Sequence, residues 1–225
     1  MASSPPGTGK DLVDRLEVRV IIFSLRDNAL QALLARSTPD SEWELPGVPI
    51  QVDQSLEEAA SQCLGHFIGL REAYLEQLYT YGHPQRDPAQ RLISVVYFAI
   101  IPADTATLPS GHPQASWFSI EALPKLILDH AEIVEYALRR LRYKLEYTAV
   151  GFELLPENFS LTELQHTYEL ILGEKLDKRN FRRRILQAGV IEPTQQSRSS
   201  EGRPARLYRY RPDAVAEVQA RRLFP

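Results

Sequence analysis

The chain has 225 residues, of which 44% are apolar and 24% are charged, and its formal net charge is −3 at pH 7. These proportions are those of a globular protein with one or two domains. No apolar run reaches the roughly 18 to 20 residues of a membrane span, and the first ten residues lack the apolar centre of a secretory signal. The single cysteine, Cys63, excludes an internal disulfide and a cysteine-rich zinc site. We therefore expect a cytoplasmic protein with no membrane partner.

Strand-like and helical segments alternate through the first two thirds of the chain. Two apolar runs, residues 16–25 and 29–36, flank Arg26-Asp27-Asn28, which predicts a β-hairpin. Residues 55–67 carry apolar side chains at helical spacing, and Gly69 is expected to end that helix. Further strands are expected at 74–81, 92–101 and 116–120, and a further helix at 129–146. The alternation predicts an α/β (α+β) domain with a mixed sheet.

The remaining residues have the pattern of a winged helix-turn-helix. Ser160-Leu161-Thr162-Glu163 is a capping box that opens a helix, Gly173 stops it, and Asp177 can cap the next helix. Phe181, Ile185 and Ala188 would face the first of these helices. Two short strands, 190–194 and 205–211, enclose a loop at 195–204 that has the length and glycine content of a wing. We assign residues 11–148 to the first domain and 149–225 to the second.

Charge is distributed unevenly between these two parts. Before Gly151, 13 Lys and Arg residues stand against 19 Asp and Glu, whereas from Gly151 onward 13 stand against 10. Between Lys175 and Arg211 the count is 11 basic to 3 acidic residues. Such clustering is the electrostatic signature of a polyanionic partner.

The segment D-K-R-N-F-R-R-R-I-L, beginning at Asp177, concentrates this charge in one short helix. Unpaired cations cannot be buried without a cost of several kcal/mol, so these side chains must face solvent, carboxylates or phosphates. Arg can pair bidentately with guanine and Asn with adenine, so the helix has both phosphate-binding and base-reading groups. The alternative is an ordinary solvated helix face. The expected DNA contacts are Lys178, Arg179, Asn180, Arg182, Arg183, Arg184, Arg198, Arg203 and Arg206.

Two groups of motifs resemble a known family. A Nudix domain is resembled by two segments, Trp43-Glu44-Leu45-Pro46-Gly47 and the helix that opens at Ser55. Two further motifs follow it, L-D-K-R-N-F-R-R-R-I-L and G-R-P-A-R-L-Y-R-Y. Together they resemble the Nudix-related transcriptional regulators of NAD metabolism, the NrtR family. The resemblance implies a Nudix-like effector-binding domain that dimerises, a DNA-binding domain behind it, and an effector such as ADP-ribose or a related NAD metabolite.

The Nudix box itself departs from the family pattern. The box needs carboxylates and an arginine that together hold magnesium on a pyrophosphate, because magnesium requires oxygen ligands. Counting forward from Gly47 places Asp53, Ser61, Gln62, Gly65 and His66 at those positions, and counting back from Gly69 places Gln54, Gln62, Cys63, His66 and Phe67 there. Neither frame supplies the metal ligands. We therefore expect no catalytic residue, no metal and no cofactor.

A domain without catalysis can still bind its ligand and act as a sensor. Arg side chains can pair with phosphates and aromatic rings can stack on adenine. The loop G-H-P-Q-R-D-P, beginning at Gly82, resembles the corresponding loop of ADP-ribose-type Nudix proteins. The candidate effector-binding residues are Arg36, Trp43, Arg86, Asp87, Arg91 and Tyr97. Their alternative role is that of solvated surface residues.

Three hypotheses remain open from the sequence. The first is a ligand-responsive transcriptional regulator, a repressor, which binds a palindromic double-stranded operator as a homodimer because two-fold sites require two-fold proteins. The second is a Nudix pyrophosphatase that acts on ADP-ribose-like substrates. The third is an adaptor whose basic segment binds an acidic protein.

Overall fold

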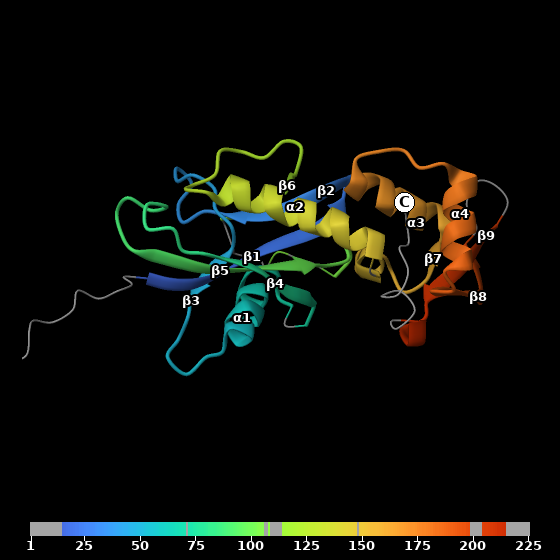
Figure 1. Ribbon diagram of the computed structural model, residues 1–225, viewed down its shortest axis with the longest axis horizontal. Helices are drawn as coiled ribbons and strands as arrows, with labels where there is room; N and C mark the ends of the chain where they lie inside the picture. The colour runs from blue at the N-terminus through green and yellow to red at the C-terminus, as the bar shows by residue number, and fades with distance from the viewer. Residues whose placement is uncertain are drawn as a thin grey trace, which may run out of the picture.

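The computed structural model describes residues 15–70, 72–105, 108, 114–147, 149–198 and 204–214. It confirms a mixed α/β domain followed by a smaller winged helix domain, which lie side by side along the long axis of the molecule (Figure 1). No helix within these residues is long and apolar enough to cross a membrane.

A mixed sheet forms the centre of the first domain. Its strands are β1 (Arg15–Arg26), β2 (Ala29–Ala35), β3 (Gly47–Pro49), β4 (Tyr74–Tyr81), β5 (Leu92–Ile100) and β6 (Ala115–Ser119). They lie in the order β4-β5-β1-β2-β6, with β3 paired to β1. The β1–β5 pair is parallel and the other pairs are antiparallel. The expected hairpin between β1 and β2 turns at Asp27 and Asn28, whose φ angles of 49° and 60° are those of a type I′ turn.

One helix covers each face of this sheet (Figure 1). Helix α1 (Leu56–Ile68) begins at the N-cap Ser55 and ends at Gly69, which adopts φ 74° as a left-handed C-cap. Helix α2 (His130–Tyr147) packs its apolar stripe on the opposite face. The burial of one apolar side of each helix against the sheet explains the two separate core clusters.

The winged helix domain follows α2 directly. Its elements are η1 (Ala149–Leu154), β7 (Phe159–Ser160), α3 (Leu161–Leu172), α4 (Lys178–Gln187), β8 (Ile191–Arg198), β9 (Ala205–Tyr210) and η2 (Pro212–Ala214). Ser160 and Glu163 form the expected capping box, and Gly173 ends α3. The expectation that residues 195–204 are all loop is wrong at its start, because β8 continues to Arg198 and pairs there with Ala205. Residues 199–203 lie outside the described part of the chain.

The two domains share one core. Apolar side chains from the α2 side of the sheet and from the winged helix domain form a single buried cluster. At the carboxyl end of α2, Arg142 Nε donates a hydrogen bond to the carbonyl oxygen of Ile171 in α3 at 2.8 Å. A Cβ added to Gly151 would lie 2.8 Å from a Leu145 carbon and 2.9 Å from the Tyr168 ring, so only glycine allows this approach. Helix α2 is therefore fixed to the sheet at one end and to α3 at the other.

Candidate nucleic-acid interface and ligand site

Helix α4 presents its cations on the side away from the core. The Asp177 side chain accepts a hydrogen bond from the backbone N–H of Asn180 at 2.7 Å, which begins the helix. Phe181 and Ile185 are buried one turn apart, as expected from their spacing. The exposed positions carry Lys178, Arg179 and Arg183, and Leu186 and Gln187 are also exposed at the end of the helix. The sequence thus fixes both the buried side and the charged side of this helix.

The α4 cations contact neutral groups within the chain. Arg182 Nη2 donates to the Thr162 hydroxyl at 3.1 Å, and Arg183 Nη2 donates to Asn180 Oδ1 at 2.8 Å. Among the residues that the structure describes, no ion pair joins a cation of α4 to a carboxylate. The positive charge of the helix is therefore available to an external anion.

The arginines of the wing have different surroundings. Arg198 forms an ion pair with Glu163 and also donates to the Asn158 carbonyl oxygen at 3.3 Å. The Arg206 guanidinium lies 6.0 Å from the centre of the Tyr208 ring, at the outer limit of a cation–π contact. Arg203 lies outside the described residues. Arg198 therefore has a carboxylate partner, whereas Arg206 has none among the residues that the structure describes.

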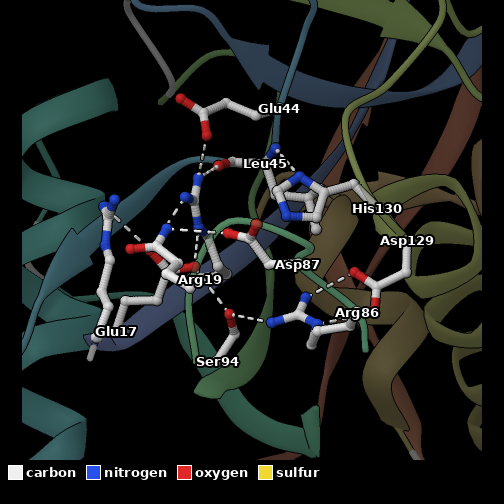
Figure 2. A network of polar contacts seen from close by, with 11 residues as sticks. Glu17, Arg19, Glu44, Leu45, Arg86, Asp87, Ser94, Asp129 and His130 are labelled. Atoms are coloured by element: carbon white, nitrogen blue, oxygen red, sulfur yellow. Dashed lines mark hydrogen bonds and ion pairs between the residues drawn. The ribbon is translucent and has the colours of Figure 1, made fainter. Parts of the chain in front are cut away.

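A buried ionic network lies inside the first domain (Figure 2). Glu17 and Arg19 point to the same side of β1 and form a bidentate pair, with nitrogen–oxygen distances of 2.7 and 3.0 Å. Arg19 Nη1 also donates to Glu44 and to the Leu45 carbonyl oxygen, each at 2.7 Å. Burial alone would raise the pKa of Glu17, but hydrogen bonds and charge attraction from Arg19 outweigh it and lower the pKa. The pair is thus ionised and almost fully buried.

Arg86 connects this network to α2. Its guanidinium forms two hydrogen bonds with Asp129, at 2.9 and 2.6 Å, and a third at 2.7 Å with the Ser94 hydroxyl. Ser94 in turn donates to Glu17 at 2.8 Å (Figure 2). Because Asp129 directly precedes α2, an anion that binds Arg86 must compete with the group that holds the start of this helix.

His130, the first residue of α2, is fully buried beside the network. Its Nδ1 accepts a hydrogen bond from the Leu45 backbone N–H at 3.1 Å, and no partner of Nε2 lies among the described residues. Burial, followed by the positive charge of Arg19, lowers its pKa to about 3. His130 is therefore neutral at physiological pH and fixes the loop before β3 to the start of α2.

The structure distributes the six expected effector residues over three places. Arg36 stacks over the Trp43 ring at 4.5 Å, near the end of β2. Arg86, Asp87 and Arg91 lie in the loop between β4 and β5, where Asp87 accepts hydrogen bonds from Ala89 and Gln90 at 2.9 Å. Tyr97 lies on the opposite face of the sheet, in the core under α1. Its hydroxyl donates to Glu57 at 3.2 Å. A single pocket does not join all six in this conformation.

Helix α1 borders a groove of about 990 Å3. The groove is lined by Gln51, Asp53, Gln54, Glu57, Glu58, Ser61, Gln62, Gly65, His66 and Gly69. Cys63 and Phe67 point away from it into the core, and Gln54 Nε2 donates to Gln62 Oε1 at 2.8 Å. Glu58 completes the capping box of α1 and is therefore held at Ser55. Across the part of the chain that the structure describes, no group of three or more His, Cys, Asp or Glu side chains could hold a metal ion.

Sequence reasoning missed most of the ionic network. Glu17, Arg19, Ser94, Asp129 and His130 were not expected to lie together. One signal was present: two opposite charges alternate with apolar residues at the centre of a strand, in L-E-V-R-V. Because side chains alternate across a strand, these two charges had to share one face.

Comparisons with known proteins match both parts of the chain. Residues 15–141 match the NUDIX domain, and residues 151–210 match the NrtR DNA-binding winged helix domain. The chain is 39% identical over 203 residues to the ADPR responsive transcriptional repressor NtrR of Acinetobacter baylyi, a match that covers 87% of this chain and 81% of that protein.

Two solved structures extend these similarities. The crystal structure of Shewanella oneidensis NrtR complexed with a 27mer DNA has a TM-score of 0.81 and 32% identity, covering 92% of this chain and 96% of that one. The NUDIX domain of the same Shewanella protein, complexed with ADP ribose, has a TM-score of 0.50 and 28% identity, covering 56% of this chain and 88% of that one. The similarity thus includes the order of the domains as well as each domain.

Proposed function

The chain belongs to the NrtR family of Nudix-related transcriptional regulators, and from this membership we propose that it is a ligand-responsive repressor in the cytoplasm. In this proposal residues 149–225 bind a palindromic DNA operator and residues 11–148 sense ADP-ribose or a related NAD metabolite and form the homodimer. The observation that carries the proposal is the charged side of α4, whose cations have no carboxylate partner among the described residues.

The side chains of α4 divide into two roles. Arg179, Asn180 and Arg183 lie together near the start of the helix, and a recognition helix contacts base edges with its N-terminal residues. We propose that these three read bases. The remaining expected contacts would bind phosphates and set the register: Lys178, Arg182, Arg184, Arg198, Arg203 and Arg206.

Regulation would begin at the Arg86–Asp129 pair. A pyrophosphate presents oxygens that can replace both oxygens of Asp129 on the guanidinium of Arg86. Such an exchange would release the start of α2, whose other end contacts α3 through Arg142. The ligand would then shift the equilibrium between DNA-competent and DNA-incompetent arrangements through its different affinity for each.

We also propose that the Nudix domain no longer hydrolyses its ligand. Counted back from Gly69, the residues at the metal-binding positions include two amides, a buried thiol and a buried phenyl ring. None of these groups replaces a carboxylate as a ligand of magnesium. The competing function, an ADP-ribose pyrophosphatase, requires magnesium-dependent turnover that Asp53→Ala abolishes. Turnover of that kind would overturn this part of the proposal.

Operator binding tests the DNA interface. Arg179→Ala and Arg183→Ala are each expected to weaken binding to the operator by about 5- to 150-fold, because each removes one bidentate contact to a base. Binding to unrelated duplex DNA should change much less. Fluorescence anisotropy with operators selected from genomic fragments measures both, at two salt concentrations.

The control is Lys125→Ala, which removes an exposed cation from the first domain. It should leave operator affinity unchanged. If both α4 variants bound the operator as tightly as the unsubstituted protein, α4 would not be the recognition helix. If no duplex DNA bound at low salt, an acidic protein partner would become the better explanation of the basic segment.

Asp129→Asn tests the proposed exchange at Arg86. The substitution keeps the shape of the side chain but removes the charge that competes with the ligand, so the affinity for ADP-ribose should rise by about tenfold. The response of operator binding to ADP-ribose should shrink, because the start of α2 is already released. Calorimetric titration and anisotropy report the two quantities. Asp40→Asn, on an exposed loop, is the control. Wild-type affinity together with a full ligand response in Asp129→Asn would exclude the exchange.

A further inference from the structure

Helix α2 carries a second ordered stripe on its exposed side. Glu132, Tyr136, Arg139 and Tyr143 recur at intervals of four, three and four residues, which places them along one line of the helix. This line lies opposite the residues that pack on the sheet, such as Ala137 and Leu141. Tyr143 is 57% exposed although it is a large aromatic residue. Aromatic and charged side chains thus alternate along the side of the helix that faces away from the sheet.

The edge strand β4 extends this surface. A β-bulge between Gln77 and Tyr79 turns Tyr79 toward Tyr81 and α2, with ring centroids 5.3 Å from Tyr81 and 6.3 Å from Tyr136. Tyr79 is nevertheless 59% exposed. The three rings, with Glu132 and Arg139, line a surface pocket of about 300 Å3. We call Tyr79, Glu132, Tyr136, Arg139 and Tyr143 the α2 face.

The α2 face is complementary to itself. When two identical helices pack antiparallel about a two-fold axis, residues equally far from the crossing point become level with one another. With the axis between Ala137 and Leu138, Glu132 becomes level with the partner's Tyr143, and Tyr136 with the partner's Arg139. A tyrosine hydroxyl can donate to the carboxylate, and a guanidinium can stack on the tyrosine ring. The acidic half of each helix then lies against the basic half of the other.

The contacts that Arg139 makes within one chain are weak enough to leave it able to form such a pair. Arg139 lies 5.7 Å from the Tyr136 ring and 3.9 Å from Glu135, and both charged side chains are about two-thirds exposed. Exposed ion pairs of this kind contribute little. Interfaces between subunits concentrate Tyr and Arg at their centre, where burial strengthens their contacts.

We propose that the α2 face is the two-fold interface between two copies of this chain. The inference rests on the proposed homodimer but assigns it a surface and a register. The winged helix domain follows α2 in each copy, so in this register the two winged helix domains lie at opposite ends of the dimer. The two α4 helices can then contact separate half-sites of one operator.

Disulfide cross-linking tests the register. Glu132→Cys and Tyr143→Cys are prepared as separate full-length proteins, mixed, and oxidised. In the proposed register the two cysteines meet only in the mixed dimer. In either protein alone, the same cysteine of the two copies would be about 16 Å apart, because eleven residues separate positions 132 and 143 along the helix. Disulfides do not bridge Cα atoms more than about 7 Å apart. The natural Cys63 is fully buried and does not compete.

A cross-linked dimer in the mixture, and none in either protein alone, is the expected result. Equal cross-linking of the single variants, or none in the mixture while the unsubstituted chain sediments as a dimer, would overturn the proposal and favour another surface such as the β4 edge. A monomer at micromolar concentration would overturn it as well. Operator binding is measured separately, so that these outcomes leave the test of α4 intact.

Charge reversal provides a second measurement. Arg139→Glu should raise the dimer dissociation constant at least about tenfold in sedimentation equilibrium, because it sets a carboxylate against the acidic half of the partner helix. Lys125→Glu reverses an exposed charge elsewhere on the same domain and should have no such effect. Equal dissociation constants for the two variants would contradict the interface.

Discussion

Glu17→Ala is expected to lower the free energy of unfolding by about 3–5 kcal/mol. The side chain of Glu17 is fully buried and accepts hydrogen bonds from Arg19 and from Ser94. Its removal leaves the guanidinium of Arg19 enclosed with Glu44 as its remaining carboxylate partner. Breaking a buried pair by deleting one partner has this cost because the other charge remains desolvated. Denaturant unfolding followed by circular dichroism measures the change.

Glu17→Gln removes the charge of the Glu17 side chain but keeps its shape. Comparing its stability with that of the unsubstituted protein at several pH values tests whether Glu17 is ionised in the folded state. Since the pKa of Glu17 is lowered in the folded protein, its charge stabilises the fold above the unfolded value near 4.5. That contribution is lost as the pH falls through the folded pKa. The difference between the unsubstituted protein and Glu17→Gln should therefore be largest near neutral pH and shrink in acid. Glu121→Ala, an exposed substitution, is the control. A loss below about 1 kcal/mol for Glu17→Ala would show that water reaches Arg19.

Local signals in the sequence were sufficient for the helices. Ser160 with Glu163, and Gly173 after Leu172, fix the two ends of α3 through contacts within a few residues, so their effects do not depend on the rest of the fold. The strands β3 and β7 were missed for the opposite reason. They have three and two residues, and they exist because β1 and β9 supply their hydrogen-bond partners. No local propensity marks so short a segment as a strand.

The DNA interface and the ligand site differ in the same way as the helices and the short strands: the first follows from local signals, and the second depends on distant parts of the chain. The DNA-binding side of α4 follows from composition and helical spacing alone, because Phe181 and Ile185 define the buried side and the arginines occupy the others. The ligand site depends on segments distant in the chain. Arg86 lies 43 residues from its partner Asp129, and a sequence pattern does not reveal which carboxylate a loop arginine meets. Tyr97 was grouped with Arg86 by chemistry, whereas the alternation of β5 places it on the face covered by α1.

Tyr168→Ala is expected to disconnect α4 from α2 and to destabilise the protein by about 3–5 kcal/mol, the range for the loss of a large buried aromatic side chain. Tyr168 is fully buried in α3, and its ring lies 5.6 Å from that of Phe181 in α4. The ring also lies so near Gly151 that a Cβ added there would be 2.9 Å from it. Its removal leaves α4 without a fixed support, so operator affinity should fall at least about tenfold while the protein is still folded. Denaturant unfolding and anisotropy measure the two effects.

Two further variants test whether operator binding depends on the position of the Tyr168 ring. Tyr168→Phe keeps the ring and should retain most of the stability and the operator affinity. Gly151→Ala keeps Tyr168 but adds a methyl group that would lie within 3.0 Å of both Leu145 and Tyr168. It should displace the ring at a cost of about 1–3 kcal/mol and weaken operator binding in the same direction. If Tyr168→Ala bound the operator with full affinity at a temperature where it is folded, α4 would be positioned without this ring. The route from Arg86 through α2 would then have to reach the DNA by other contacts.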